Sequence, residues 1–281
     1  MEDRIALVTD STCDLDSEVV QRHGIHVLPL KVVYGERVYH DRVDITPQEV
    51  YGRLEQEIPT TSTPSPQEVI DLLTEIRDKG FTRVLAIHIS SGLSGTWNVV
   101  HMAAQEVSSL KTVAIDSKSL SMGLGFVVEQ AARWIEEKMD FATLVKRCED
   151  MVDRSKAFYV LKTLEYLRRG GRINTVAAAV AGVLDLKPII SIDKQGKYFS
   201  FRRVRGRNQS IRELLEIARE AVAAGLTRVA VMHGDALEEG RALYEKVRQL
   251  PGIEEVIFAQ IGPVLVVHTG PGLLGIALTR A

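Results

Sequence analysis

Hydroxyl-bearing residues and glycines occur together in "SSGLSGTW", residues 90–97, between an apolar strand pattern and an amphipathic helix pattern. Hydroxyl groups and unobstructed backbone N–H groups are donors that hold phosphates and carboxylates. Gly92 and Gly95 let the backbone approach a ligand closely, and Ser94 supplies a hydroxyl between them. The stretch therefore indicates an anion site, without identifying the anion.

Two further polar stretches, "TDSTCD" at 9–14 and "DSKSLSMGLG" at 116–125, also follow predicted strands and precede predicted helices. In open α/β sheets, ligands bind outside the carboxyl ends of the strands. The alternative is that these serines, threonines and aspartates only cap helices. Because three such loops would meet at one edge of the sheet, the pattern favours a shared polar pocket.

A fourth stretch, "IPTTSTPSP" at 58–66, places hydroxyl-bearing residues between prolines. Such a loop loses little entropy on ordering and could present its hydroxyls rigidly. The pattern alone slightly favours a stiff connector whose Ser65 caps the next helix.

Basic side chains form the other candidates. His268, in "HTGPGLLG", is predicted at the end of an apolar strand, where it could donate to an anion or act as a base. A lone histidine at such a position is more often simply hydrogen-bonded in place. Arg172 and Arg205 belong to arginine clusters that could bind phosphate or dock a partner, the alternative being a solvated charged face.

Several well-defined catalytic motifs are missing. There is no phosphate-binding G-x-x-x-x-G-K-[ST], and "MGLGFVV" lacks the third glycine of G-x-G-x-x-G. The glycine after Ser94 comes one place too early for the G-x-S-x-G nucleophile motif. His23 and His26 are spaced like metal ligands, but no cluster of Cys, His or acidic residues accompanies them. We expect no resident nucleotide, metal or cofactor.

Composition bounds the class of protein. The chain has 281 residues, enough for one large domain or two ordinary ones. Its 35 Lys+Arg and 37 Asp+Glu give a net charge of -2, which argues against a nucleic-acid-coating protein. Two cysteines, a start unlike a signal peptide and the lack of a long apolar stretch predict a cytoplasmic protein.

Alternating strand and helix patterns predict the fold class. "RIALVTD", "TRVLAIHI" and "KTVAIDS" are typical of buried strands, and helical patterns separate them. This order favours an α/β fold with a mostly parallel sheet and helices on both faces. The later part differs: a strand pattern and a short helix pattern precede a hairpin pattern at 187–204, which predicts a second α/β domain.

The predicted domain boundary follows this change of pattern. We expect an N-terminal domain over residues 1–155, carrying the hydroxyl-rich loops, and a C-terminal domain over 156–281. The last predicted strands, about 262–280, would pack near the N-terminal site.

Taken together, the motifs give a specific match. The chain resembles the DegV family, the bacterial fatty-acid-binding proteins that serve fatty acid kinase. Seven matching stretches run through the chain in family order: "VTDSTCDL", "PTTSTPSP", "ISSGLSGTW", "IDSKSLSMGLG", "TLEYLRRGGRI", "KPIISI" and "HTGPGLLGI".

The resemblance implies a two-domain protein that holds a long-chain fatty acid, such as palmitate or oleate, between or within its domains. It assigns Arg172 and Arg205 to the pocket entrance or to partner docking. Thr63 departs from the glutamine found in many members. The implied carboxylate-binding residues are Thr61, Ser62, Ser94, Gly95 (through its backbone) and His268.

Three functions remain open. The first is a lipid-binding subunit without catalytic residues, which presents the fatty acid to the ATP-binding subunit of fatty acid kinase for acyl-phosphate formation. Such a subunit would serve phospholipid metabolism, with transient contact with a membrane surface. The second is a hydrolase or acyltransferase that uses Ser94 and His268 on a lipid-like substrate. The third, a nucleic-acid-binding sensor, lacks a basic stripe or DNA-binding motif.

Overall fold

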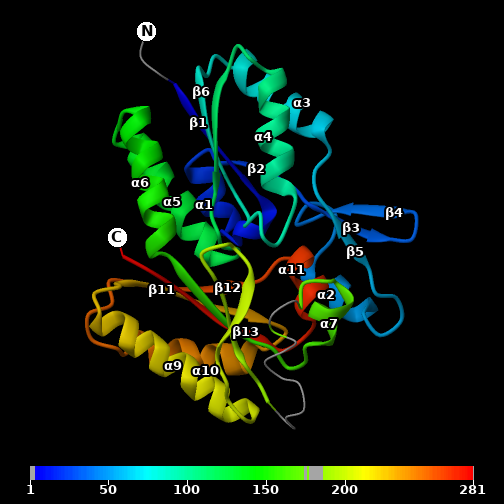
Figure 1. Cartoon of the computed structure of the whole chain (residues 1–281), viewed down its shortest axis with the longest axis vertical. Helices are drawn as coiled ribbons and strands as arrows, with labels where there is room; N and C mark the ends of the chain where they lie inside the picture. The colour runs from blue at the N-terminus through cyan, green and yellow to red at the C-terminus, as the bar shows by residue number, and fades with distance from the viewer. Residues whose placement is uncertain (1–3, 174–175, 177–185, 281) are drawn as a thin grey trace.

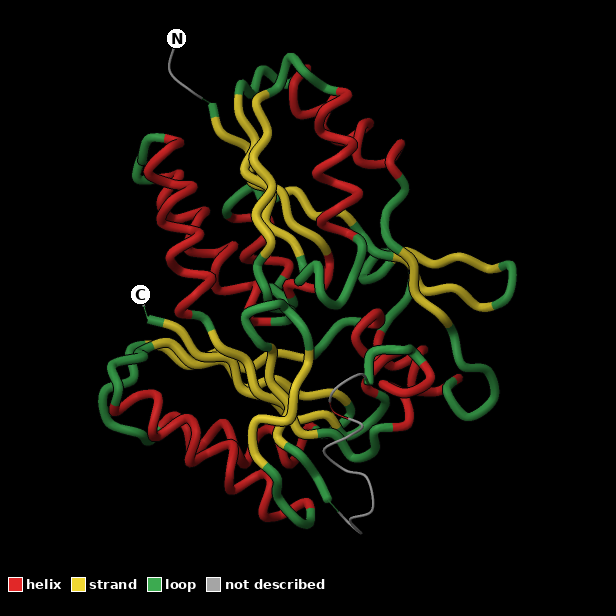
Figure 2. Tube along the Cα trace, in the orientation of Figure 1, coloured by secondary structure: helices red, strands yellow, loops and turns green. Residues whose placement is uncertain are grey.

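The structure, a computed structural model, describes residues 4–173, 176 and 186–280. Two main sheets and one small sheet organise the chain (Figure 1). The tube in Figure 2 shows the first main sheet between flanking helices, and the second with its helices on the side away from the first. The predicted fold class, two-domain α/β with a mostly parallel first sheet, is confirmed.

The first sheet has the order β2-β1-β6-β7, and all its pairings are parallel. Alternate strand residues point to opposite faces, so Leu7 and Leu85 pack toward α5 while Ala6 and Val84 pack toward α3 and α4. The elements of this part are β1 (Ile5–Asp10), η1 (Ser11–Cys13), α1 (Ser17–Arg22), β2 (His26–Leu28), α3 (Pro66–Asp78), β6 (Arg83–His88), α4 (Thr96–Glu106), β7 (Lys111–Asp116), α5 (Met122–Glu136) and α6 (Phe141–Arg154).

A small antiparallel sheet projects from the first domain. It comprises β3 (Lys31–Tyr34), β4 (Arg37–His40) and β5 (Thr60–Ser62), and α2 (Pro47–Arg53) lies between β4 and β5 in the chain. The proline-flanked stretch is therefore a strand, whereas the sequence favoured a connector. Its hydroxyl-bearing residues pair with β3, with Thr61 opposite the buried Val32.

The second sheet has the order β10-β9-β8-β13-β11-β12, and only β11 and β12 run parallel. Helices α9 and α10 cover one face, and the other face lies toward the first domain. The elements are β8 (Lys156–Val160), α7 (Glu165–Arg169), β9 (Ile189–Ile192), β10 (Tyr198–Arg202), α9 (Arg207–Ala223), β11 (Arg228–Gly234), α10 (Leu237–Arg248), β12 (Glu255–Gln260), α11 (Pro263–Thr269) and β13 (Leu273–Thr279).

Strand alternation assigns the residues of this sheet to two cores. On β8, Phe158 and Val160 join the core under α9 and α10, whereas Ala157 and Tyr159 join the core shared with the first domain. The predicted boundary at residue 155 falls between α6 and β8.

One sequence prediction needs correction. Residues 263–269 form the helix α11, not a strand, although β13 is a strand as expected. Pro263 occupies the first turn of this helix, a position that suits its fixed φ and missing N–H. Every residue of α11 except His268 is buried, so the apolar run has no helical periodicity to distinguish it from a buried strand.

Among the described residues, no helix has the length and apolar character needed to cross a membrane.

Candidate functional site

A narrow apolar cavity lies where the first domain, the inner face of the second sheet and α11 meet. The lining residues are Leu30, Thr61, Ile89, Leu93, Ser94, Leu120, Ser121, Tyr159, Leu161, Leu167, Arg172, Ile190, Tyr198, Ile261, Val264, Leu265, His268, Thr269 and Leu273. Most are aliphatic, so the cavity suits a ligand that is apolar over most of its length.

A polar pair marks one part of this wall. Thr61 Oγ1 lies 2.8 Å from His268 Nε2, which joins β5 to α11 across 207 residues of sequence. Thr61 faces inward because its cross-strand neighbour Val32 is buried, and paired residues in a sheet point to the same side. The two residues offer a hydroxyl and an imidazole to a ligand in the cavity.

The imidazole of His268 is held in an uncharged state. Burial, and next the Arg172 guanidinium, lower the pKa of His268 to about 4. Its Nδ1 is buried without a hydrogen-bond partner among the described residues. A Cβ on Gly170 would lie only 2.2 Å from this atom, so the glycine permits the close approach of α7 to the ring. A neutral imidazole carries one N–H that can donate to an anion.

The position of α11 depends on carboxylates from the first domain. Asp14 accepts a hydrogen bond from the Gly262 N–H (2.9 Å), and Asp41 accepts one from the Val264 N–H (3.1 Å). Arg42 donates to Asp14 at 2.6 Å. Negative groups at a helix N-terminus satisfy its unpaired N–H groups and favour its dipole. These contacts attach the helix that carries His268 to the domain that carries Thr61.

Ser94 lies in the loop between β6 and α4. Its Oγ lies 2.9 Å from Thr96 Oγ1 and accepts a hydrogen bond from the Thr96 N–H at 3.3 Å. Gly95 is the N-cap of α4 and supplies no side-chain cap. It does not line the cavity, but it places the positive end of the α4 dipole beside Ser94, which does.

The second domain packs directly against the loop that carries Ser94. A Cβ on Gly92 would lie 2.4 Å from the Gly196 carbonyl oxygen, so only glycine fits without displacing the β9–β10 turn. Ser90 Oγ donates to the same carbonyl at 2.7 Å. Arg172 Nε donates to the Leu93 carbonyl at 3.3 Å. The loop with Ser94 is therefore fixed between the two domains.

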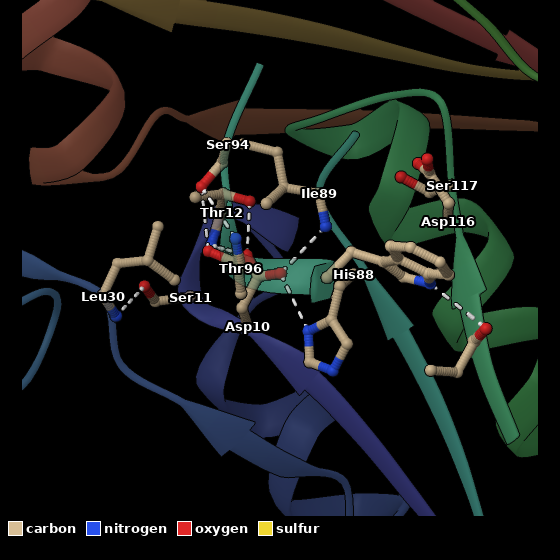
Figure 3. A network of polar contacts seen from close by, with 12 residues as sticks. Asp10, Ser11, Thr12, Leu30, His88, Ile89, Ser94, Thr96, Asp116 and Ser117 are labelled. Atoms are coloured by element: carbon tan, nitrogen blue, oxygen red, sulfur yellow. Dashed lines mark hydrogen bonds and ion pairs between the residues drawn. The ribbon is translucent and has the colours of Figure 1, made fainter. Parts of the chain in front are cut away.

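A buried hydrogen-bond network at the carboxyl ends of β1 and β6 holds the loops that follow these strands (Figure 3). Asp10 accepts hydrogen bonds from the Thr12 N–H, the Thr12 hydroxyl and the Ile89 N–H, and its Oδ2 lies 3.0 Å from His88 Nδ1. Neither Asp10 nor Thr12 lines the cavity. Their role is to hold together the carboxyl ends of β1 and β6, and Asp10 also caps the short helix η1, so the capping alternative holds for Asp10.

The structure does not bring every predicted site residue to the cavity. Ser62 is exposed on the opposite face of β5 from Thr61, because successive side chains of a strand alternate. Arg205 is also exposed and forms an isolated bridge with Leu186 rather than lining the cavity. Arg172 does line it, close to His268.

In the part of the chain that the structure describes, Ser94 and His268 are not arranged as in a serine hydrolase. Among the described residues, His268 Nε2 contacts Thr61 and its Nδ1 has no carboxylate partner, while Ser94 contacts Thr96. A nucleophilic serine needs a base within hydrogen-bond reach, and the base needs a group that orients it. Neither relation occurs for Ser94 and His268 within the described ranges.

Several site residues escaped the sequence analysis. Asp14 and Asp41 position α11, and Tyr159 adds a phenol to the cavity wall. The sequence placed Asp14 in a polar loop, but its partner Gly262 is 248 residues away. The orientation of Tyr159 toward the cavity follows from the period-two pattern of β8, but only once it is known which face of the second sheet lines the cavity.

The fold and the site define a two-domain α/β protein that encloses an apolar cavity with a hydroxyl and an imidazole in its wall. The model of the DegV family of uncharacterised proteins matches residues 4–281. The chain belongs to the DegV family, which confirms the predicted resemblance. A DegV domain-containing protein of Clostridium acetobutylicum is 39% identical over 277 residues, covering 98% of this chain and 99% of that protein.

Solved structures of this family include fatty-acid-binding proteins. A DegV family protein from Thermus thermophilus, described as binding fatty acid, is 33% identical with a TM-score of 0.91, over 99% of this chain and 100% of the other. DegV from Bacillus subtilis, a fatty acid binding protein, is 31% identical with a TM-score of 0.91 over the same shares. A stearic-acid-binding protein from Eubacterium ventriosum is 29% identical with a TM-score of 0.90, over 98% of each chain.

Proposed function

We propose that this protein binds a long-chain fatty acid, such as palmitate or oleate, with its tail in the cavity and its carboxylate beside Thr61, Ser94 and His268. The observation that carries the proposal is the aliphatic cavity with the Thr61–His268 pair in its wall. The fatty-acid-binding relatives support it.

The tail and the head group contribute differently. Burial of about 0.8 kcal/mol per methylene gives on the order of 10 kcal/mol for a chain of about sixteen carbons, before the costs of association. Each polar contact to the head group contributes only about 1–3 kcal/mol. The tail therefore sets the affinity, and the hydroxyls and neutral imidazole set the orientation of the carboxylate.

The finer part of the proposal is that this subunit presents the carboxylate to the ATP-binding subunit of fatty acid kinase. There a carboxylate oxygen would attack the terminal phosphorus of ATP, giving an acyl phosphate and ADP. The missing nucleotide motifs support a separate catalytic subunit. Arg172, in the cavity wall, and the exposed Arg205 are the residues we assign to the entrance and to docking. Acyl-phosphate formation would take place in the cytoplasm, and the protein would contact a membrane surface transiently.

Solvent extraction of the purified protein followed by mass spectrometry tests the binding step. We expect a long-chain fatty acid in the extract, or stoichiometric uptake of added palmitate or oleate. A protein that carries no fatty acid and takes up neither would refute the proposal.

Reconstitution with the kinase subunit tests the presentation step. Arg205→Glu should slow acyl-phosphate formation while leaving palmitate retention unchanged. Arg219→Glu, on an exposed face of α9, is the matched control and should leave both unchanged. Equal turnover by the two variants would exclude docking through Arg205.

A further inference from the structure

The acyl cavity contains one hydroxyl that the proposed function leaves unexplained. Tyr159 lines the cavity, is only 3% exposed, and its Oη has no hydrogen-bond partner among the described residues. A buried polar group without a partner destabilises the protein, so such groups are rare in native structures.

Four serine and threonine hydroxyls around the cavity have polar partners, unlike that of Tyr159. Thr61 contacts His268, Ser94 contacts Thr96, and the Ser121 hydroxyl donates to Asp14. A fourth, on Thr269, donates to a backbone carbonyl of its own helix at 2.8 Å. Tyr159 therefore differs from these four residues in lacking any polar partner among the described residues.

The ring of Tyr159 is held in place. A Cβ on Gly275, its neighbour on β13, would lie 2.9 Å from Tyr159 Cδ1, so the ring packs directly over the glycine. Tyr198 meets it edge-on at a centroid distance of 6.4 Å. A ring with these contacts cannot rotate its hydroxyl into solvent without repacking the sheet surface.

The hydroxyl is a donor and comes from a different element of the cavity wall than the head-group residues. Burial, followed by the nearby Tyr198 and Asp14, raises the pKa of Tyr159 well above its usual value, so the phenol stays protonated. Tyr159 comes from β8 in the second sheet, whereas Thr61 and His268 come from β5 and α11. A ligand whose carboxylate lies at the head-group residues would pass Tyr159 with its tail.

We propose that the acyl chain this protein binds most tightly carries an oxygen atom along its length, as in a hydroxy or keto fatty acid, and that Tyr159 donates a hydrogen bond to that oxygen. The inference rests on the proposed function and specifies its substrate class. A plain saturated tail would leave the phenol unsatisfied, whereas a tail oxygen at the matching position would satisfy it. The position of the oxygen along the acyl chain would then determine which fatty acids bind most tightly.

Competition binding with stearate, oleate and a series of hydroxystearates, in which the hydroxyl group moves along the chain, tests the inference. We expect at least one hydroxystearate to bind wild-type protein about tenfold more tightly than stearate, which corresponds to about 1.4 kcal/mol. In Tyr159→Phe, which keeps the ring and removes only the oxygen, that preference should vanish and stearate should bind more tightly than to wild type.

Tyr51→Phe is the matched control. Its hydroxyl is also buried without a described partner, but Tyr51 does not line the cavity, so the preference should persist. Equal affinity for stearate and every hydroxystearate, or a preference unchanged in Tyr159→Phe, would overturn the inference. A preference for oleate over stearate that is lost in Tyr159→Phe would also overturn the inference, because the phenol would then interact with a double bond rather than with an oxygen. Failure of every acid to bind wild-type protein would instead contradict fatty-acid binding itself.

Discussion

At the scale of single residues, the site depends on which side of a short strand a hydroxyl faces. Thr61 and Ser62 are equivalent in the sequence, and the resemblance assigned the carboxylate to both. Once β5 is paired to β3, alternation turns Thr61 toward His268 and Ser62 toward solvent. Because the strand has only three residues between prolines, its pattern alone could not make this distinction.

Thr61→Val should weaken fatty-acid binding by about 1.5–3 kcal/mol, the range for a hydrogen bond to a charged group. The substitution keeps the shape of the side chain and removes the hydroxyl that faces His268. Isothermal titration calorimetry with palmitate would measure this loss of binding free energy. Ser62→Ala is the neighbouring control and should bind like wild type; the reverse ranking of the two variants would contradict the assignment.

The pKa of His268 should report the bound carboxylate. In the structure it is lowered to about 4, below the usual value of about 6.5. A carboxylate beside the ring favours the imidazolium and should raise this pKa. The protein would then take up protons on binding, so affinity should rise as pH falls through the pKa of the loaded form and level off near the free value of about 4.

Nuclear magnetic resonance titration of the His268 ring, with and without stearate, would measure this shift. His101, which stacks on Trp97 and does not line the cavity, serves as the internal control. An unchanged His268 titration in saturated protein would show that the carboxylate lies elsewhere.

At the scale of elements, the position of the Ser94 loop depends on a glycine that the second domain covers. The sequence identified Gly92 as a place of close backbone approach, which the structure explains by the Gly196 carbonyl rather than by a ligand. For the helix α11, by contrast, the sequence pattern did not predict the correct element. Its buried apolar run could not be distinguished from a strand, because helical periodicity needs an exposed face.

Gly92→Ala should reduce both stability and palmitate affinity, because the added methyl group would meet the Gly196 carbonyl at 2.4 Å. Overpacking of this kind costs about 1–3 kcal/mol. Gly52→Ala, at an exposed helical position with nothing within 4 Å, should be neutral or stabilise by up to about 1 kcal/mol. Thermal unfolding of the two variants would measure the contrast, and similar melting temperatures would contradict it.

At the scale of the whole molecule, the cavity exists because two domains share one core. The strand and helix alternation predicted the α/β class and the parallel first sheet. The cavity, by contrast, depends on contacts such as Asp14 with Gly262, which no local pattern encodes. A buried ion pair adds to the attachment of the domains: Arg228 on β11 donates to Glu129 on α5 at 2.8 Å and stacks over Phe126.

Arg228→Met should lower the free energy of unfolding by about 3 kcal/mol, because it leaves Glu129 buried with one partner fewer. Arg219→Met breaks an exposed pair on α9 and should change it by less than about 1 kcal/mol. Urea denaturation would compare them. Equal effects would mean that the buried pair does not hold the domains together.

The central claim is that a fatty-acid carboxylate lies at the Thr61–His268 pair. A crystal structure of the protein with stearate would test it most directly. The account predicts the carboxylate within about 3 Å of Thr61 Oγ1, Ser94 Oγ and a ring nitrogen of His268, with the tail along the aliphatic wall. A stearate bound with its head group away from these residues, or outside the cavity, would contradict it.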